Sequence, residues 1–255
     1  MHDSAVTVIP PGRGEVVGDS PDRRVEILSD HEALAVTWSR FSPGRAGADL
    51  HVHRRHVDLF YVLEGELTVM FGAGGEETTV PAGTLVRVPP LVVHGFRNAS
   101  DAELRYLNFH APGMGFADYL RGARDGRAIG YDQEPPPDGG RPATEAELGG
   151  ERGAARDGVQ VLVDVEEIAV AECRIDHGSP PPPVRPRDGR RQAFYVLEGE
   201  LVLGAGDREL RAVAGSWIEL PPGVAPSVAS PGPSAARFLH LHAPAGGSDR
   251  RPLSQ

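Results

Sequence analysis

The octapeptide FYVLEGEL occurs twice in this chain, at residues 60–67 and again at 194–201. Two further pairs of segments repeat in the same order. PAGTLVRVPP (81–90) matches VAGSWIELPP (213–222), and YLNFHAP (106–112) matches FLHLHAP (238–244). Because the order is kept across most of the chain, the repeated unit is a whole domain and not a short solenoid repeat.

Each half consists of short segments rich in β-branched and aromatic residues, separated by glycine and proline, of which the chain has 32 and 24. Regular spacing of this kind favours an all-β antiparallel sandwich or barrel. We expect few helices. One is predicted at 116–123 (FADYLRGA), and another at 143–150 (ATEAELGG), where Thr144 and Glu147 are spaced for a capping box.

The duplication predicts three parts: an N-terminal barrel over residues 1–123, a surface linker rich in Gly and Pro over 124–157, and a C-terminal barrel over 158–255. The 255 residues are enough for two domains of ordinary size. Each barrel can therefore bury a core of its own.

Composition excludes several classes of protein. The net charge is −10 and there is no basic tract, which argues against nucleic-acid binding. All 26 basic residues are arginine, which indicates a high-GC genome and rules out Schiff-base chemistry on lysine. No apolar stretch approaches a membrane span, the first residues do not resemble a secretory signal, and Cys173 is the sole cysteine. We therefore expect a cytoplasmic protein without disulfides.

The segment just before the first FYVLEGEL reads HVHRRHVD (51–58). His51 and His53 are two residues apart, so on a strand they point to the same face. Asp58 follows after a short turn, and antiparallel pairing can bring His94 to the same face. Three imidazoles and a carboxylate suit one ion of Fe, Mn, Ni, Cu or Zn, with one or two positions left open.

These residues carry a resemblance to the cupin superfamily, and with the duplication the chain looks like a bicupin over about residues 25–112 and 160–244. The first cupin motif is matched by Gly44, His51, His53, Asp58 and Gly65, and the second by Gly83, Pro89, Leu91, His94 and Asn98. The resemblance implies two tandem jelly-roll (double-stranded β-helix) barrels and a metal held by His51, His53, Asp58 and His94. The quercetinase-like dioxygenases are the nearest functional analogy.

Three positions depart from the cupin pattern. Asp58 stands in place of the usual glutamate and is one methylene shorter, so it binds the metal directly, through water, or not at all. Gly44 lies one residue further from His51 than expected. Leu91 replaces a turn glycine, which should alter the hairpin before His94.

The second half has lost the same residues. Arg185, Arg187, Gln192 and Pro226 stand where His51, His53, Asp58 and His94 stand in the first half. We therefore expect no metal in the C-terminal barrel.

Two more histidines, His56 and His110, are candidates for the same site. His56 is a candidate acid/base or outer-shell group, and the alternative is an exposed loop histidine. His110 shares one strand face with Tyr106 and Asn108 and could project into the pocket. Because His242 occupies the equivalent place in the half without metal ligands, a structural or inter-barrel role for His110 is favoured.

The leading functional hypothesis is a metal-dependent, dioxygenase-like oxidoreductase acting on a small organic molecule in the N-terminal barrel. Isomerase or decarboxylase chemistry uses similar sites, and a non-catalytic sensor or small-molecule-binding barrel is the alternative. We expect a small-molecule ligand, no nucleic-acid or membrane partner, and a monomer or homodimer.

Overall fold

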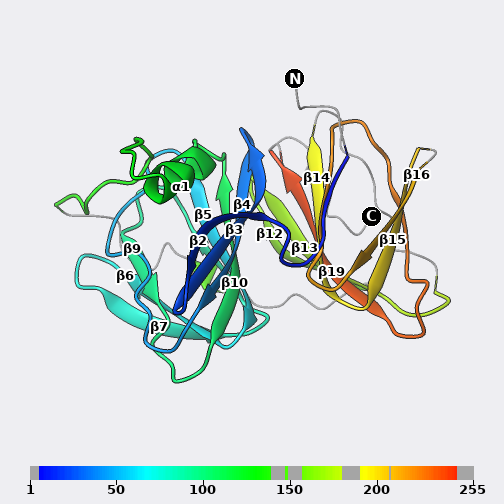
Figure 1. Cartoon of the computed structure of the whole chain (residues 1–255), viewed down its shortest axis with the longest axis horizontal. Helices are drawn as coiled ribbons and strands as arrows, with labels where there is room; N and C mark the ends of the chain where they lie inside the picture. The colour runs from blue at the N-terminus through cyan, green and yellow to red at the C-terminus, as the bar shows by residue number, and fades with distance from the viewer. Residues whose placement is uncertain (1–5, 139–146, 149–156, 180–189, 207, 246–255) are drawn as a thin grey trace. The chain divides into compact units, whose positions relative to one another are not determined.

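The structure, a computed structural model, describes residues 6–138, 147–148, 157–179, 190–206 and 208–245 (Figure 1). Nearly all of its regular elements are strands, and every strand pairing is antiparallel within these ranges. The all-β fold class is therefore confirmed. No helix in the described ranges is long and apolar enough to cross a membrane.

The chain divides into two compact units, residues 15–150 and residues 1–14 with 151–255, called here the N-terminal unit and the C-terminal unit. In the N-terminal unit a large sheet has the order β11-β8-β5-β10-β4-β3-β2 and a small sheet has the order β7-β6-β9. The strands are β2 (Glu15–Ser20), β3 (Arg23–His31), β4 (Leu34–Phe41), β5 (Val57–Glu64), β6 (Glu66–Phe71), β7 (Glu76–Pro81), β8 (Leu85–Val88), β9 (His94–Arg97), β10 (Leu104–Ala111) and β11 (Glu147–Leu148).

The C-terminal unit repeats this plan with a sheet of order β1-β17-β14-β19-β13-β12 and a second sheet of order β16-β15-β18. Its strands are β1 (Thr7–Ile9), β12 (Val159–Asp164), β13 (Ala169–Ile175), β14 (Arg191–Glu198), β15 (Glu200–Ala205), β16 (Arg208–Val213), β17 (Trp217–Leu220), β18 (Ser227–Ala229) and β19 (Ala236–Ala243). Strands β4 to β10 and β13 to β19 occupy equivalent places, so the duplication seen in the sequence is a duplication of topology.

Two segments lie elsewhere than we expected from the sequence. Thr7–Ile9 pairs with β17 of the C-terminal unit, although it precedes the N-terminal barrel in the chain. Part of the expected linker belongs to the N-terminal unit, since Glu134 pairs with Val52 and β11 pairs with β8. The physical reason is the same in both places: an unpaired strand edge offers backbone groups that a neighbouring segment can satisfy.

The single helix of the described ranges, α1 (Phe116–Arg124), lies where the first helix was predicted. It buries Ala117 and Leu120 against Val17 of β2 and against Val25 and Ile27 of β3. Of the second predicted helix, only Glu147–Leu148 is described. These two residues form β11, so the helix prediction is wrong there, and the rest of that segment lies outside the described residues.

The repeated FYVLEGEL segment forms the same part of the core in each unit. Phe60, Val62 and Leu67 are buried in the N-terminal unit, and their counterparts are buried in the other. The glycine, Gly65 or Gly199, has a φ of 75° in both copies, and a Cβ there would collide with the backbone carbonyl just before β10 or β19, that of Glu103 or Ala235. FYVLEGEL is therefore scaffold.

Candidate metal centre

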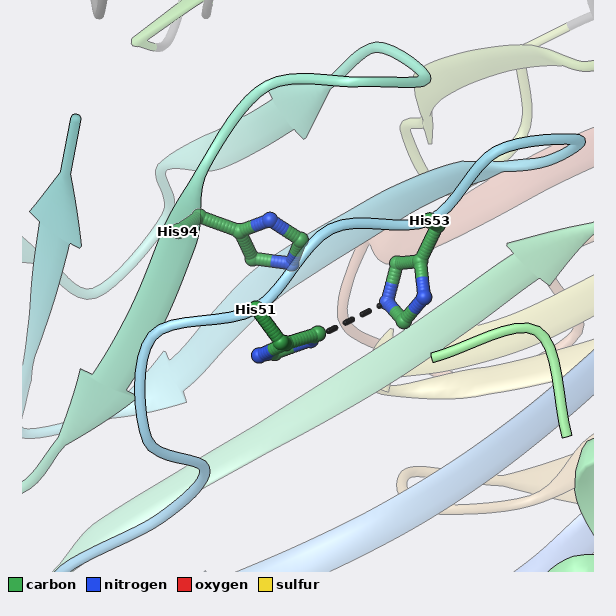
Figure 2. Close-up of side chains that lie close together, drawn as sticks. All are labelled: His51, His53 and His94. Carbon is green, nitrogen blue, oxygen red and sulfur yellow. Dashed lines mark hydrogen bonds between the residues drawn. The ribbon is translucent and has the colours of Figure 1, made fainter. Parts of the chain in front are cut away.

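Three imidazoles converge in the N-terminal unit (Figure 2). The backbones of His51 and His94 pair as an antiparallel bridge, with N···O distances of 2.9 and 3.0 Å. His53 lies two residues further along the same segment, and its Nε2 is 3.2 Å from Nε2 of His51. The ring nitrogens of the three residues lie within 4.8 Å of one another, and all three side chains are buried.

The outer nitrogen of each ring faces a backbone carbonyl. The Nδ1 atoms lie 2.7 Å from Asp49 O for His51, 2.5 Å from Asp132 O for His53, and 3.0 Å from Val92 O for His94. A carbonyl only accepts, so each ring carries its proton on Nδ1 and presents a lone pair on Nε2. The 3.2 Å contact between two Nε2 atoms thus joins two acceptors, an arrangement that a cation between them would stabilise.

Asp58 completes the cluster from β5. Its Oδ2 lies 3.2 Å from His94 Nε2 and 3.7 Å from His53 Nε2, while Oδ1 accepts a 2.5 Å hydrogen bond from Asn108 Nδ2. Burial alone would raise the pKa of Asp58, but His110, His53 and His94 outweigh it and hold that pKa well below its usual value. The shorter aspartate therefore still brings an ionised oxygen to the cluster; its direct binding of a metal stays a prediction.

His56 is fully buried, so it is not an exposed loop residue. Its Nδ1 lies 2.9 Å from Asp132 Oδ2, and its Nε2 lies 2.8 Å from the Tyr131 hydroxyl and 3.0 Å from His110 Nδ1. Burial, reinforced by His53, lowers the pKa of His56 to about 4. The imidazole is therefore neutral near pH 7, and it has hydrogen-bond partners on both nitrogens.

His110 lies inside the site, in contrast to the structural role that the sequence favoured. Its Nδ1 is 2.6 Å from the Tyr131 hydroxyl, its Nε2 is 2.9 Å from Asn108 Oδ1, and it also lies 3.8 Å from Asp58 Oδ1. Burial lowers its pKa well below the usual value. With His53 and His56 it forms a second group of closely spaced imidazoles.

Sequence reasoning missed Tyr131 and Asp132, because both lie in the segment assigned to the linker. Asp132 accepts backbone N–H bonds from Arg54 (3.2 Å) and Arg55 (2.8 Å) and so fixes the turn between His53 and His56. The only signal in the sequence is a Tyr-Asp pair inside an otherwise Gly- and Pro-rich stretch, GYDQEPPPDGG.

The hairpin before His94 shows how the leucine is accommodated. Leu91 has a φ of 67°, the left-handed region that favours glycine, and its N–H bonds to His53 O at 2.7 Å. The backbone thus keeps a glycine-type conformation, so the turn is not altered as expected. We expect local strain at Leu91 instead.

In the C-terminal unit the equivalent places hold other contacts. Gln192, at the Asp58 position, donates Nε2–H to Val224 O at 2.9 Å, and its Oε1 lies 3.2 Å from His240 Nε2. Pro226 is buried at the His94 position. Arg185 and Arg187 lie outside the described residues. Both groups of imidazoles spaced for a cation within the described ranges come from the N-terminal unit.

A cavity of about 220 Å³ adjoins the cluster inside the N-terminal unit. His51, His53 and Asp58 lie in its wall, and Phe116, Tyr119 and Leu120 of α1 also line it. The potential metal ligands therefore face a space that a small molecule can enter.

Comparison with known proteins agrees with this architecture. Residues 37–110 match the cupin domain family. No curated protein sequence matches the chain. The protein YlbA from E. coli is similar in structure, with a TM-score of 0.69 and 11% identity over 98% of this chain and 94% of that one.

Two other solved structures are similar. AerE from Microcystis aeruginosa has a TM-score of 0.65 and 12% identity, over 92% of this chain and 98% of that one. A deletion mutant of oxalate decarboxylase from Bacillus subtilis has a TM-score of 0.67 and 14% identity, over 96% of this chain and 78% of that one. At such low identity these likenesses show the fold alone.

Proposed function

We propose, from the premise that this chain belongs to the cupin superfamily, that its N-terminal unit is a mononuclear metal enzyme acting on a small organic molecule. One observation carries the proposal: three Nε2 lone pairs and an ionised carboxylate oxygen meet in a buried cluster. Four acceptors gathered without a donor among them are what a divalent transition metal requires.

In this proposal His51, His53, His94 and Asp58 hold the ion, which is Fe, Mn, Ni, Cu or Zn. When bound, the ion supplies Lewis-acid activation of a coordinated oxygen. The carbonyls of Asp49, Val92 and Asp132 fix the three rings with their lone pairs inward. The adjoining cavity leaves one side of the cluster open to a substrate.

The reaction class that we propose first is dioxygenase-like oxidation of the substrate with O2. It is supported by the resemblance to dioxygenase-type bicupins and by the four-ligand site with room for a substrate oxygen. A second class, isomerisation or decarboxylation, is favoured by a different observation. His56, Tyr131 and His110 form a buried hydrogen-bonded group beside the ligands, which can hold a proton near the substrate.

The test begins with protein purified without added metal and then loaded with each candidate ion. Oxygen uptake is followed against a panel of catechols, diketones, flavonols and small organic acids, and each compound is also incubated without O2. Uptake that disappears in a His51→Ala, His53→Ala variant supports the oxygenase. Conversion without O2 supports the second class, and binding without conversion would leave a ligand-binding or sensor barrel instead.

A further inference from the structure

Arg23 lies in the wall of the same cavity, and the metal cluster does not account for it. It begins β3, opposite Phe41 of β4, and its guanidinium carbon lies 5.8 Å from the centre of the Phe41 ring. The side chain is half-buried. Partial burial of a charged group is costly unless something accepts hydrogen bonds from it.

The acidic residues near Arg23 are already occupied by other arginines. Asp19 and Glu26 pair with Arg24 at 2.8 and 2.7 Å, and Asp22 pairs with Arg45 at 3.0 Å. Within the described ranges, no carboxylate forms an ion pair with Arg23 itself. A guanidinium that points into a cavity without a protein counterion suits a carboxylate brought by a ligand, which it can bind with two parallel hydrogen bonds.

Polar groups connect Arg23 with the metal cluster along the inner face of the large sheet. Thr37 and Ser39 of β4 lie opposite Asn108 and Tyr106 of β10, and all four residues line the cavity. The Tyr106 hydroxyl is hydrogen-bonded to Ser39, and burial raises the pKa of Tyr106, so the phenol keeps its proton. The wall between the two ends therefore offers hydroxyl groups to a polar ligand.

The charges of the cavity favour an anion at both ends. A divalent ion held by neutral imidazoles and one aspartate leaves a net positive charge at one end, and Arg23 adds a positive charge at the other. The volume of about 220 Å³ lies below the roughly 300–1,000 Å³ of pockets for drug-sized molecules, so the cavity suits a small ligand.

We infer that the substrate is a small organic acid with two acidic ends, one bound at the metal cluster and the other, a carboxylate, bound by Arg23. This inference rests on the proposed function for its first end only. Arg23 is a binding residue in this scheme, and its removal should weaken binding of the ligand without affecting the metal.

The test compares matched pairs of simple acids by calorimetric titration into the metal-loaded protein. Dicarboxylates of three to six carbons (malonate to adipate) are each paired with the monocarboxylate of the same length. We expect at least one dicarboxylate to bind 10-fold or more tightly than its partner, and Arg23→Gln to abolish that gap. Arg105→Gln, which removes a partly exposed arginine of β10 paired with Glu64 and Glu103, is the matched control and should keep the difference.

The two parts of this inference, binding at the metal cluster and binding by Arg23, can be contradicted separately. If Arg23→Gln folds, retains its metal and keeps the full gap, or if no dicarboxylate outbinds its monocarboxylate partner, the role of Arg23 is overturned. The metal end is examined with the monocarboxylates alone, whose affinity should fall when the His51→Ala, His53→Ala variant removes the ion. If the monocarboxylate affinity is unchanged while the difference in affinity between dicarboxylate and monocarboxylate still depends on Arg23, the proposed metal function fails. The carboxylate site at Arg23 then still stands.

Discussion

The two units place different side chains at equivalent positions of one fold. On the inner face of the N-terminal sheet, Thr37 and Ser39 of β4 face Asn108 and Tyr106 of β10. At the same positions in the C-terminal unit, Ala171 and Cys173 of β13 face His240 and Phe238 of β19. Hydroxyl-bearing side chains line a cavity in the first unit, whereas Ala171, Cys173 and Phe238 belong to an apolar core cluster in the second.

This difference separates what the fold requires from what the chemistry requires. The scaffold residues, such as Phe60 and Phe194, are buried at the same place in both units. Among the described residues, the C-terminal unit has no counterpart of the cation-spaced histidine cluster or of the Thr37 and Ser39 hydroxyls, so the fold does not need them for its packing. Apolar side chains at these positions would add buried apolar surface, worth about 25 cal/mol per Å². The N-terminal unit forgoes this stabilisation where polar side chains line its cavity.

The largest expected effect is on metal content. Protein purified without added metal should contain close to one transition-metal ion per chain, and His51→Ala with His53→Ala should remove it completely while the chain stays folded, because the core is untouched. Elemental analysis combined with circular dichroism measures both. Two ions per chain would contradict the expected difference between the units, because the C-terminal unit would then have a metal site of its own.

Asp58 and Gln192 occupy equivalent positions and allow a paired test. Asp58→Asn removes the ionised oxygen beside His94, so metal affinity should fall about 10- to 100-fold, the range typical for groups that tune a metal site. Gln192→Ala is the control in the other unit. Competition with a chromogenic chelator measures the affinity. Equal affinity for Asp58→Asn and the unmodified protein would show that the aspartate does not contribute to binding.

Acid should destabilise the metal-free N-terminal unit through its buried imidazoles. His56 has a pKa of about 4 when folded and near 6.5 when unfolded, so between these values the unfolded chain binds more protons. Stability therefore falls as the pH falls from 6.5 to 4, by about 1 kcal/mol per pH unit for this residue. His51, whose pKa burial lowers to about 3, acts in the same direction.

Urea unfolding in the presence of a chelator, repeated between pH 4 and 7.5, measures this dependence. His56→Asn should flatten the slope, and His177→Asn, which replaces an exposed histidine of the C-terminal unit, serves as the control. An unchanged slope for His56→Asn would contradict the assignment of the buried neutral imidazole.

Exchanging side chains between Ser39 and Cys173 should have unequal effects. Burial raises the pKa of Cys173 to about 12, and the thiol packs within the apolar core. Cys173→Ser places a hydroxyl there and should cost about 1–3 kcal/mol of unfolding free energy. Ser39→Cys should cost less, because Ser39 borders the cavity. In a Trp38→Phe background, Trp217 reports unfolding of the C-terminal unit, and in a Trp217→Phe background, Trp38 reports unfolding of the N-terminal unit. Equal costs would contradict the difference between the two inner faces.

The smallest effect concerns Leu91. Its φ of 67° is strained for a side chain with a Cβ, and the residue is 36% exposed, so little burial would be lost. Leu91→Gly should raise the unfolding free energy by up to about 1 kcal/mol. Leu91→Ala keeps the Cβ and serves as the control. Thermal unfolding measures both, and a destabilised Leu91→Gly would show that the leucine side chain contributes packing that outweighs the strain.

The sequence by itself determined the duplication, the all-β class and α1. These follow from local patterns, since strand periodicity, turn glycines such as Gly65 and the repeated core residues all involve residues close together in the sequence. It also singled out His51, His53, Asp58 and His94 as residues for one site. Their spacing on strands, together with the cupin resemblance, was enough to predict that they would meet.

Only the tertiary structure decided which other groups lie close to these four residues. Tyr131 and Asp132 reach His56 from a segment that reads as a linker, and His110 reaches Asp58 across two paired strands. Arg23 has no ion pair within the described residues, because its acidic neighbours pair with other arginines. Contacts between residues far apart in the chain depend on strand order and edge pairing, which spacing along the sequence does not encode.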